Sequence, residues 1–138
     1  MYLNGTGVLK DYAEAVKWYR IAAEQGDAAA QYNLGVMYLN GTGVLKDYAE
    51  AVKWHQLSAE QGRASAQNNL GVMYEHGDGV LQDNVTSHMW YNIASANGHK
   101  KAGGYRDELA ALMTADAIEK ATAMARECMK SDYKKCGQ

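Results

Sequence analysis

One repeat dominates this chain, because residues 1–18 and residues 37–54 both read MYLNGTGVLKDYAEAVKW. The offset is 36 residues, and a third, more diverged copy follows at the same offset. The positions that the third copy shares with the second include Tyr74, Gly77, Gly79, Val80, Asp83 and Trp90. A period of this length is typical of a solenoid, in which each unit buries its apolar face only against its neighbours.

Composition and charge exclude several classes of partner. The 138 residues are 47% apolar and 22% charged, which is ordinary for a soluble globular protein, and the net charge is −2. Charges of both signs are interspersed, so no long-range field attracts nucleic acid or an anionic membrane. No apolar run approaches the roughly 20 residues of a membrane span, and the N-terminus lacks the layout of a signal peptide. The compartment stays open: periplasmic or secreted if a parent protein carries a signal peptide, cytoplasmic otherwise.

The repeats show the apolar spacing of amphipathic helices. In Asp11–Gln25, apolar residues recur at i, i+3, i+4 and i+7, and Trp18 widens this stripe. Asp11 can cap the start of this helix, and Gly26 can end it. The same reasoning predicts helices over 27–40, 47–61 and 63–75. Between the first two of these, residues 40–46 form a glycine-rich loop in which Val44 turns back toward the core.

The first ten residues raise the question of what precedes them. Met1–Lys10 matches residues 37–46, so we expect it to be the end of a helix followed by a loop. The helix that would pair with Asp11–Gln25 is then missing upstream. Three interpretations follow: the chain is a piece of a longer protein, its open end is covered by self-association or another chain, or it starts naturally with a frayed helix.

The pattern LGxMYxxGxGVxxDxxxAxxWxxxxAExG resembles the Sel-one-like repeat (SLR) family, a relative of the tetratricopeptide class. The residues on this signature are Leu34, Gly35, Tyr38, Gly41, Gly43, Val44, Asp47, Ala51, Trp54, Ala59 and Gly62. The resemblance runs from Met1 to about Ala102 and implies an all-α, right-handed α/α solenoid of antiparallel helix pairs. In the third copy Ser87, His88 and Met89 replace Ala, Val and Lys, so we expect that unit to pack against something other than a standard repeat.

After Gly98 the period decays, and we expect a C-terminal cap. Residues 99–113 and 114–132 are predicted to be a last helix pair, and their sequence is similar to the ending of many bacterial members of the family. We therefore divide the chain into three parts. Residues 1–102 are repeats, of which the first is truncated. Residues 103–132 are capping helices, and residues 133–138 are a mobile tail. Cys128 and Cys136 would form a disulfide in an exported protein or stay free in a cytosol.

No motif for catalysis, a cofactor or a metal stands out. The Gly-x-Gly triplets lack the lysine and the strand-to-helix context of a phosphate loop, so we interpret them as turns. The histidines, His55, His76, His88 and His99, lack the i, i+4 spacing of a helical metal pair. We therefore predict no enzyme. The history of the family suggests one alternative, a hydrolase of cell-wall or β-lactam type, but the relatives in question carry a cystine in every repeat, unlike the repeats here.

The resemblance implies that the first helix of each pair lines a concave groove, which is where we expect a peptide or protein partner to bind. The candidate positions are Tyr32, Asn33, Val36, Asn40, Asn68, Asn69, Val72 and His76. Between copies Tyr32 becomes Asn68, and Leu39 becomes Glu75, the one carboxylate of the expected groove. A tailored binding surface and drift on a solvated face explain this variation equally well.

Two of these positions, Asn33 and Asn69, do not vary. They correspond to an asparagine that binds a peptide backbone or terminal carboxylate in carboxylate-clamping tetratricopeptide proteins. An amide both donates and accepts, which suits a backbone ligand, and the structural alternative is a hydrogen bond from helix to loop. We therefore predict a protein-interaction scaffold or adaptor that holds a peptide or a partner's helix.

Overall fold

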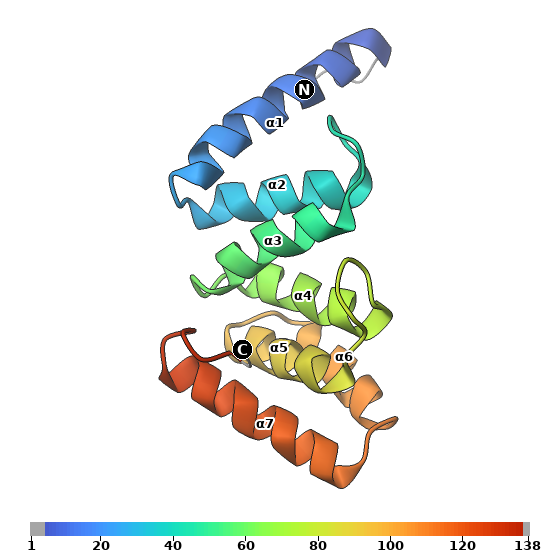
Figure 1. Ribbon diagram of the computed structural model, residues 1–138, viewed down its shortest axis with the longest axis vertical. Coiled ribbons are helices and arrows are strands. Elements are labelled where there is room, and N and C mark those ends of the chain that lie inside the picture. Colours follow the sequence, from blue (N-terminus) through green and yellow to red (C-terminus); the bar gives the residue numbers. More distant parts are fainter. Residues whose placement is uncertain (1–4, 137–138) are drawn as a thin grey trace.

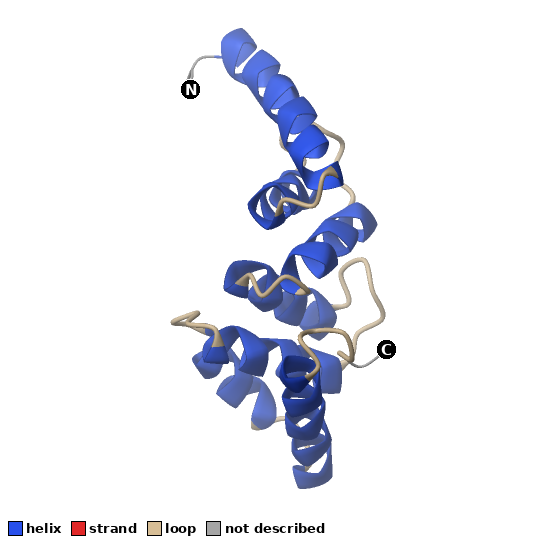
Figure 2. Ribbon diagram, turned by 90° about the vertical axis from the view of Figure 1, so that its left-hand side faces the viewer, coloured by secondary structure: helices blue, strands red, loops and turns tan. Residues whose placement is uncertain are grey.

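The computed structural model describes residues 5–136, which form seven α-helices and no strand within that range (Figure 1). The helices are α1 (Gly5–Glu24), α2 (Ala28–Asn40), α3 (Tyr48–Ala59), α4 (Ala64–His76), α5 (Asn84–Ala96), α6 (Ala102–Ala110) and α7 (Ala115–Lys130). They are stacked along one elongated molecule, as Figures 1 and 2 show. The predicted all-α solenoid is confirmed, and α2, α3, α4, α6 and α7 lie within three residues of the predicted bounds.

Each regular unit is a pair of helices, α2 with α3 and α4 with α5. The first helix of each pair ends at a left-handed glycine, Gly41 or Gly77. The second helix begins after an aspartate: the carboxylates of Asp47 and Asp83 each accept a backbone N–H of the first turn at 3.1 Å. These local signals set the helix ends at the same place in both pairs.

The loop within each pair packs against the second helix of the pair before it. A Cβ at Gly43 would lie 2.6 Å from the carbonyl oxygen of Tyr12, so only glycine allows this approach. We expected the same loop before Asp11, but residues 5–10 have the conformation of helix α1 instead. The described residues contain no earlier pair against which that loop could pack. Residues 1–4 of this expectation lie outside the described residues.

The core is divided between successive pairs. Trp54 of α3 is 4% exposed and packs with Ala30 and Leu34 of α2, while Trp90 of α5 is 1% exposed. We expected Trp18, the matching residue of α1, to widen a buried stripe, but it is 64% exposed. Trp18 is exposed because the described residues include no helix before α1 that could pair with it and cover this side chain.

The C-terminal helices depart from the repeat, because α6 and α7 each pack chiefly on α5 rather than on each other. Met89 of α5 is fully buried beside Ala125 and Cys128 of α7, whereas its counterpart in α3, Lys53, is exposed. The expectation that the third unit packs against something other than a standard repeat is confirmed. Helix α7 is that element.

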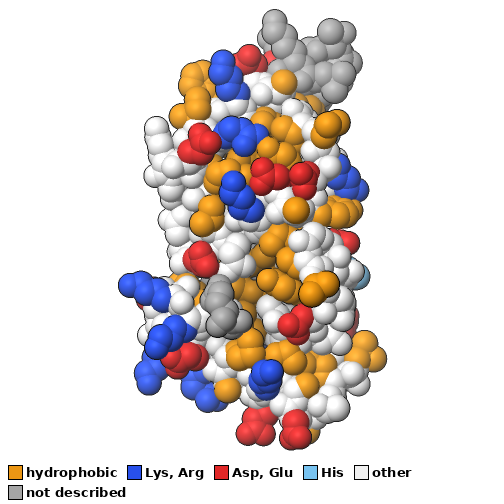
Figure 3. Space-filling model, viewed as in Figure 1, with side chains coloured by type: hydrophobic (Ala, Val, Ile, Leu, Met, Phe, Trp, Pro, Cys, Tyr) orange, Lys and Arg blue, Asp and Glu red, His pale blue; other side chains and the backbone are white. Residues whose placement is uncertain are grey.

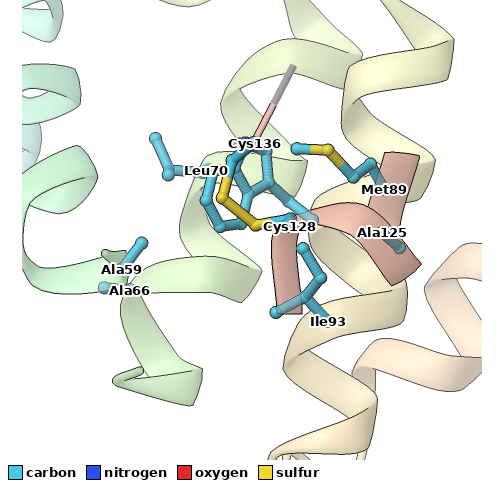
Figure 4. Close-up of a cluster of buried hydrophobic side chains, with 9 residues drawn as sticks. Ala59, Ala66, Leu70, Met89, Ile93, Ala125, Cys128 and Cys136 are labelled. Carbon is cyan, nitrogen blue, oxygen red and sulfur yellow. A yellow bond between two sulfur atoms is a disulfide. The ribbon is translucent and has the colours of Figure 1, made fainter. Parts of the chain in front are cut away.

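A disulfide between Cys128 and Cys136 folds the end of the chain back onto the core (Figure 4). Cys136 is buried next to Trp90, and the Tyr133 hydroxyl accepts a hydrogen bond of 2.9 Å from the Asn97 amide. The expectation of a mobile tail is therefore wrong for residues 133–136. Residues 137–138 lie outside the described residues.

Candidate functional site

The predicted site residues lie on α2 and α4, the first helices of two consecutive pairs. Asn40 and His76 are exposed at the helix ends, Asn68 is buried, and the remaining five, Tyr32, Asn33, Val36, Asn69 and Val72, are half-buried. An open hollow elsewhere on the molecule is lined by Glu60, Asp132, Tyr133 and Lys134, none of which is a predicted site residue.

Two of the predicted residues are engaged in packing between helices. The ring of Tyr32 meets His55 of α3 edge-on, with 5.5 Å between ring centroids, and the Arg63 guanidinium lies 5.1 Å from its centre. Asn68 is only 8% exposed, and its Oδ1 has no hydrogen-bond partner among the described residues. Both side chains are less open to a ligand than the sequence suggested.

Asn33 and Asn69 stand one period apart on α2 and α4. Within residues 5–136, neither side-chain amide forms a hydrogen bond to another residue, so the alternative of a helix-to-loop bond is not found there. Both residues are half-buried. Their amides keep two donors and one acceptor oxygen each for a ligand.

A further polar arrangement lies where α4 meets α5. The Tyr91 hydroxyl donates a hydrogen bond of 2.7 Å to Glu75 Oε1. Burial first, and then the bond to Glu75 and its negative charge, raise the pKa of the Tyr91 phenol well above its usual range. Gly71 makes room for the ring, because a Cβ there would lie 2.5 Å from Tyr91 Cδ1. Tyr91 is therefore a fixed, neutral donor to the carboxylate.

Helix α6 brings a second aromatic residue to this place. Tyr105 is 37% exposed, and its ring centroid lies 5.8 Å from that of Tyr91. Sequence reasoning placed Glu75 in the expected groove but missed both tyrosines. The period could have found Tyr105, because it stands one repeat after Asn69.

The α2–α3 pair carries a histidine, His55, at the repeat position that Tyr91 occupies in the α4–α5 pair. His55 is fully buried, and neither ring nitrogen has a hydrogen-bond partner in the described part of the chain. Burial lowers the pKa of His55 to about 4, so the ring is neutral at pH 7. His55 is thus a packing residue, and its ring lies over Gly35.

Other kinds of site were also sought in residues 5–136. No three His, Cys, Asp or Glu side chains there are grouped so that they could hold a metal ion. None of the described helices combines the length and the apolar character that crossing a bilayer requires. On the side seen in Figure 3, acidic, basic and hydrophobic side chains are interspersed.

Comparison with known proteins gives a consistent result. The model of the family described as Sel1 repeat matches residues 1–27, 28–62 and 64–99. No curated protein sequence matches the chain.

The solved structures that are similar to it include two bacterial proteins. One is c5321, a protective antigen present in uropathogenic Escherichia coli strains that displays an SLR fold (35% identity, TM-score 0.83). That match covers 88% of this chain but only 27% of c5321. The other is a Sel1 repeat protein from Oxalobacter formigenes, with 42% identity, a TM-score of 0.67, and coverage of 69% of this chain and 71% of that one. With the family model matching well over half of its residues, this chain belongs to the Sel1 repeat family.

Proposed function

We propose that this chain is a non-enzymatic scaffold that binds an extended peptide or partner segment along α2 and α4. Sel1 repeats typically mediate protein interactions, which supports the general role. The observation that carries the specific proposal is the pair Asn33 and Asn69, which are half-buried and whose amides form no hydrogen bond within residues 5–136. A polar group that has no partner within the protein can bond to a ligand without breaking an internal hydrogen bond.

The spacing of the two asparagines suits an extended ligand. Packed helix axes lie about 8–10 Å apart, so with α3 between α2 and α4 the two asparagines stand no more than about 20 Å apart. An extended chain rises about 3.3 Å per residue, so the two amides would meet peptide groups no more than about six residues apart. Each amide can donate to a backbone carbonyl and accept from a backbone N–H. Binding would then depend on the peptide backbone more than on any one side chain.

Selection from a phage-displayed library of random peptides, about 12 residues long so that one peptide spans both sites, tests this role. The affinity of a selected synthetic peptide is measured for the parent chain, for the N33A/N69A variant and for Q25A. Gln25 is an exposed amide directly after α1, outside α2 and α4, and serves as the matched control. We expect the double variant to bind about tenfold or more weakly, and Q25A to bind like the parent. Equal affinity for all three proteins would remove this role.

We also propose that two copies associate through α1. Trp18 is exposed there, whereas its repeat counterpart Trp54 is buried against the first helix of its pair. A second copy's α1 would supply that cover and continue the stacking. Sedimentation velocity of the parent and of Trp18→Glu over a concentration series tests this, and a monomeric parent at every concentration would reject it.

A further inference from the structure

We propose that Glu75, Tyr91 and Tyr105 form a receptor for the cationic side chain of a lysine or arginine in the bound peptide. This inference rests on the proposed function and adds to it the chemical class of one ligand side chain. We call these three residues the cation receptor.

The receptor is assembled from three successive helices. Tyr91 lies on α5, which packs against both α4 and α6 (Figure 1). Its hydroxyl meets Glu75 of α4 at 2.7 Å, and its ring meets that of Tyr105 of α6 at 5.8 Å with the planes tilted by 52°. A carboxylate and two aromatic rings are thereby brought to one place.

The carboxylate of Glu75 keeps binding capacity after its bond to Tyr91. An ionised carboxylate can accept about four hydrogen bonds, and only one is used by Tyr91. Among the described residues, no lysine or arginine forms an ion pair with Glu75. The side chain is half-buried, so an ammonium or guanidinium group that reached it would be partly shielded from water, which strengthens the attraction.

The two tyrosines favour the same kind of ligand. The face of an aromatic ring attracts a cation through its quadrupole, at distances up to about 6 Å from the ring centre. Tyr105 is exposed enough to offer such a face, while Tyr91 is buried and holds the carboxylate in position. A cationic side chain would contact a ring and a carboxylate together, whereas a neutral or acidic one would lose both attractions.

The nearest cation on α6 is already engaged elsewhere. Arg106 follows Tyr105 directly, but its guanidinium donates to Asn92 Oδ1 at 2.8 Å and to Asp107 Oδ1 at 3.0 Å. Arg106 therefore does not occupy the position that we assign to the ligand.

The α2–α3 pair lacks this arrangement, so the receptor occurs at one place in the described residues. One repeat earlier, the positions of Glu75, Tyr91 and Tyr105 are taken by Leu39, His55 and Asn69. These three positions thus include no carboxylate, and the ring among them is a buried histidine without hydrogen-bond partners in the described residues. A peptide carrying one cationic residue would be fixed in register, with that residue at the α4–α6 end.

The experiment uses a peptide selected as above and a twin in which its lysine or arginine is replaced by norleucine or citrulline. We expect the parent chain to prefer the cationic peptide by about tenfold. We expect Glu75→Gln to abolish most of this preference, because its amide oxygen still accepts from Tyr91 but carries no charge. Tyr105→Leu keeps the carboxylate and should reduce the preference only in part. The N33A/N69A variant should bind both peptides more weakly while keeping the preference.

The outcomes separate the two proposals. Peptides that require Asn33 and Asn69, but bind the parent equally well with and without the cationic residue, would overturn the receptor alone. A preference that survives Glu75→Gln would overturn it as well. If no peptide is selected at all, the proposed function fails and the receptor fails with it.

Discussion

Trp54 and Trp18 occupy the same position of the repeat, yet Trp54 is 4% exposed and Trp18 is 64% exposed. Trp54 lies against Ala30 and Leu34 of α2, the first helix of its own pair. The same residue type in the same local sequence thus contributes to the core only where a neighbouring helix covers it.

This pair gives a prediction for stability. We expect Trp54→Ala to lower the free energy of unfolding by about 3–5 kcal/mol, because it leaves a large cavity in the core. At a protein concentration where the chain is monomeric, Trp18→Ala should cost less than about 1 kcal/mol, as an exposed substitution does. Urea denaturation of the two variants and the parent measures both values. Similar losses for the two would show that Trp18 is buried in solution.

A second prediction concerns the contact that holds Tyr91 in place. A Cβ at Gly71 would lie 2.5 Å from the Tyr91 ring, so Gly71→Ala should force the ring or helix to shift and cost about 1–3 kcal/mol. Gly104 in α6 is the matched control, because a Cβ there meets nothing within 4 Å. Gly104→Ala should stabilise the chain by about 0.5–1 kcal/mol through helix propensity. Thermal and urea unfolding of both variants should move in opposite directions, and a shift in the same direction would contradict this packing.

These cases show what the sequence could and could not predict. Apolar spacing and caps such as Asp47 are local signals, so the helices of the regular pairs were predictable from them. Residues 5–10 and 41–46 have the same sequence but different conformations, because only the second copy lies on a preceding described helix, α1. No local pattern distinguishes the two.

The candidate site, too, was predictable only in part. The period was sufficient to find Asn33 and Asn69, because each repeats the other's position. The bond between Tyr91 and Glu75 was not predictable, because it depends on how closely α5 approaches α4 over Gly71. Burial of Asn68 likewise comes from contacts with neighbouring helices that a single repeat does not contain.

Acid should destabilise the chain through His55. Its pKa is lowered from 6.5 to about 4 by burial, so between these values the unfolded chain binds a proton that the folded chain does not. The stabilisation is therefore complete above about pH 6.5 and is lost progressively as the pH falls toward 4. A difference of this size corresponds to about 3 kcal/mol at the acid end. Urea denaturation between pH 7 and pH 4 measures the slope.

The control for this slope is a variant without a titrating ring at that position. His55→Phe should flatten the profile between pH 6.5 and pH 4, whereas His76→Asn, a change at an exposed histidine, should not. Burial also lowers the pKa of His88, which adds a slope common to all three proteins. An unchanged profile in His55→Phe would mean that the His55 ring is hydrated.

The last prediction concerns the disulfide that holds residues 131–136 against the core. Closing a loop of this length restricts the unfolded chain and should contribute about 2–3 kcal/mol. Replacing both Cys128 and Cys136 by serine should cost at least that much, because Cys136 is also buried beside Trp90 and burying a hydroxyl there removes it from water. Release of the tail should also free Tyr133 from Asn97 and give Trp90 access to water, which shifts its fluorescence to longer wavelength.

The parent in a dithiol reductant should show the same fluorescence shift. The variant Trp54→Phe assigns this signal, because it leaves Trp90 as the buried tryptophan. A reduced parent as stable as the oxidised one, with unchanged fluorescence, would show that packing of the tail does not depend on the bond.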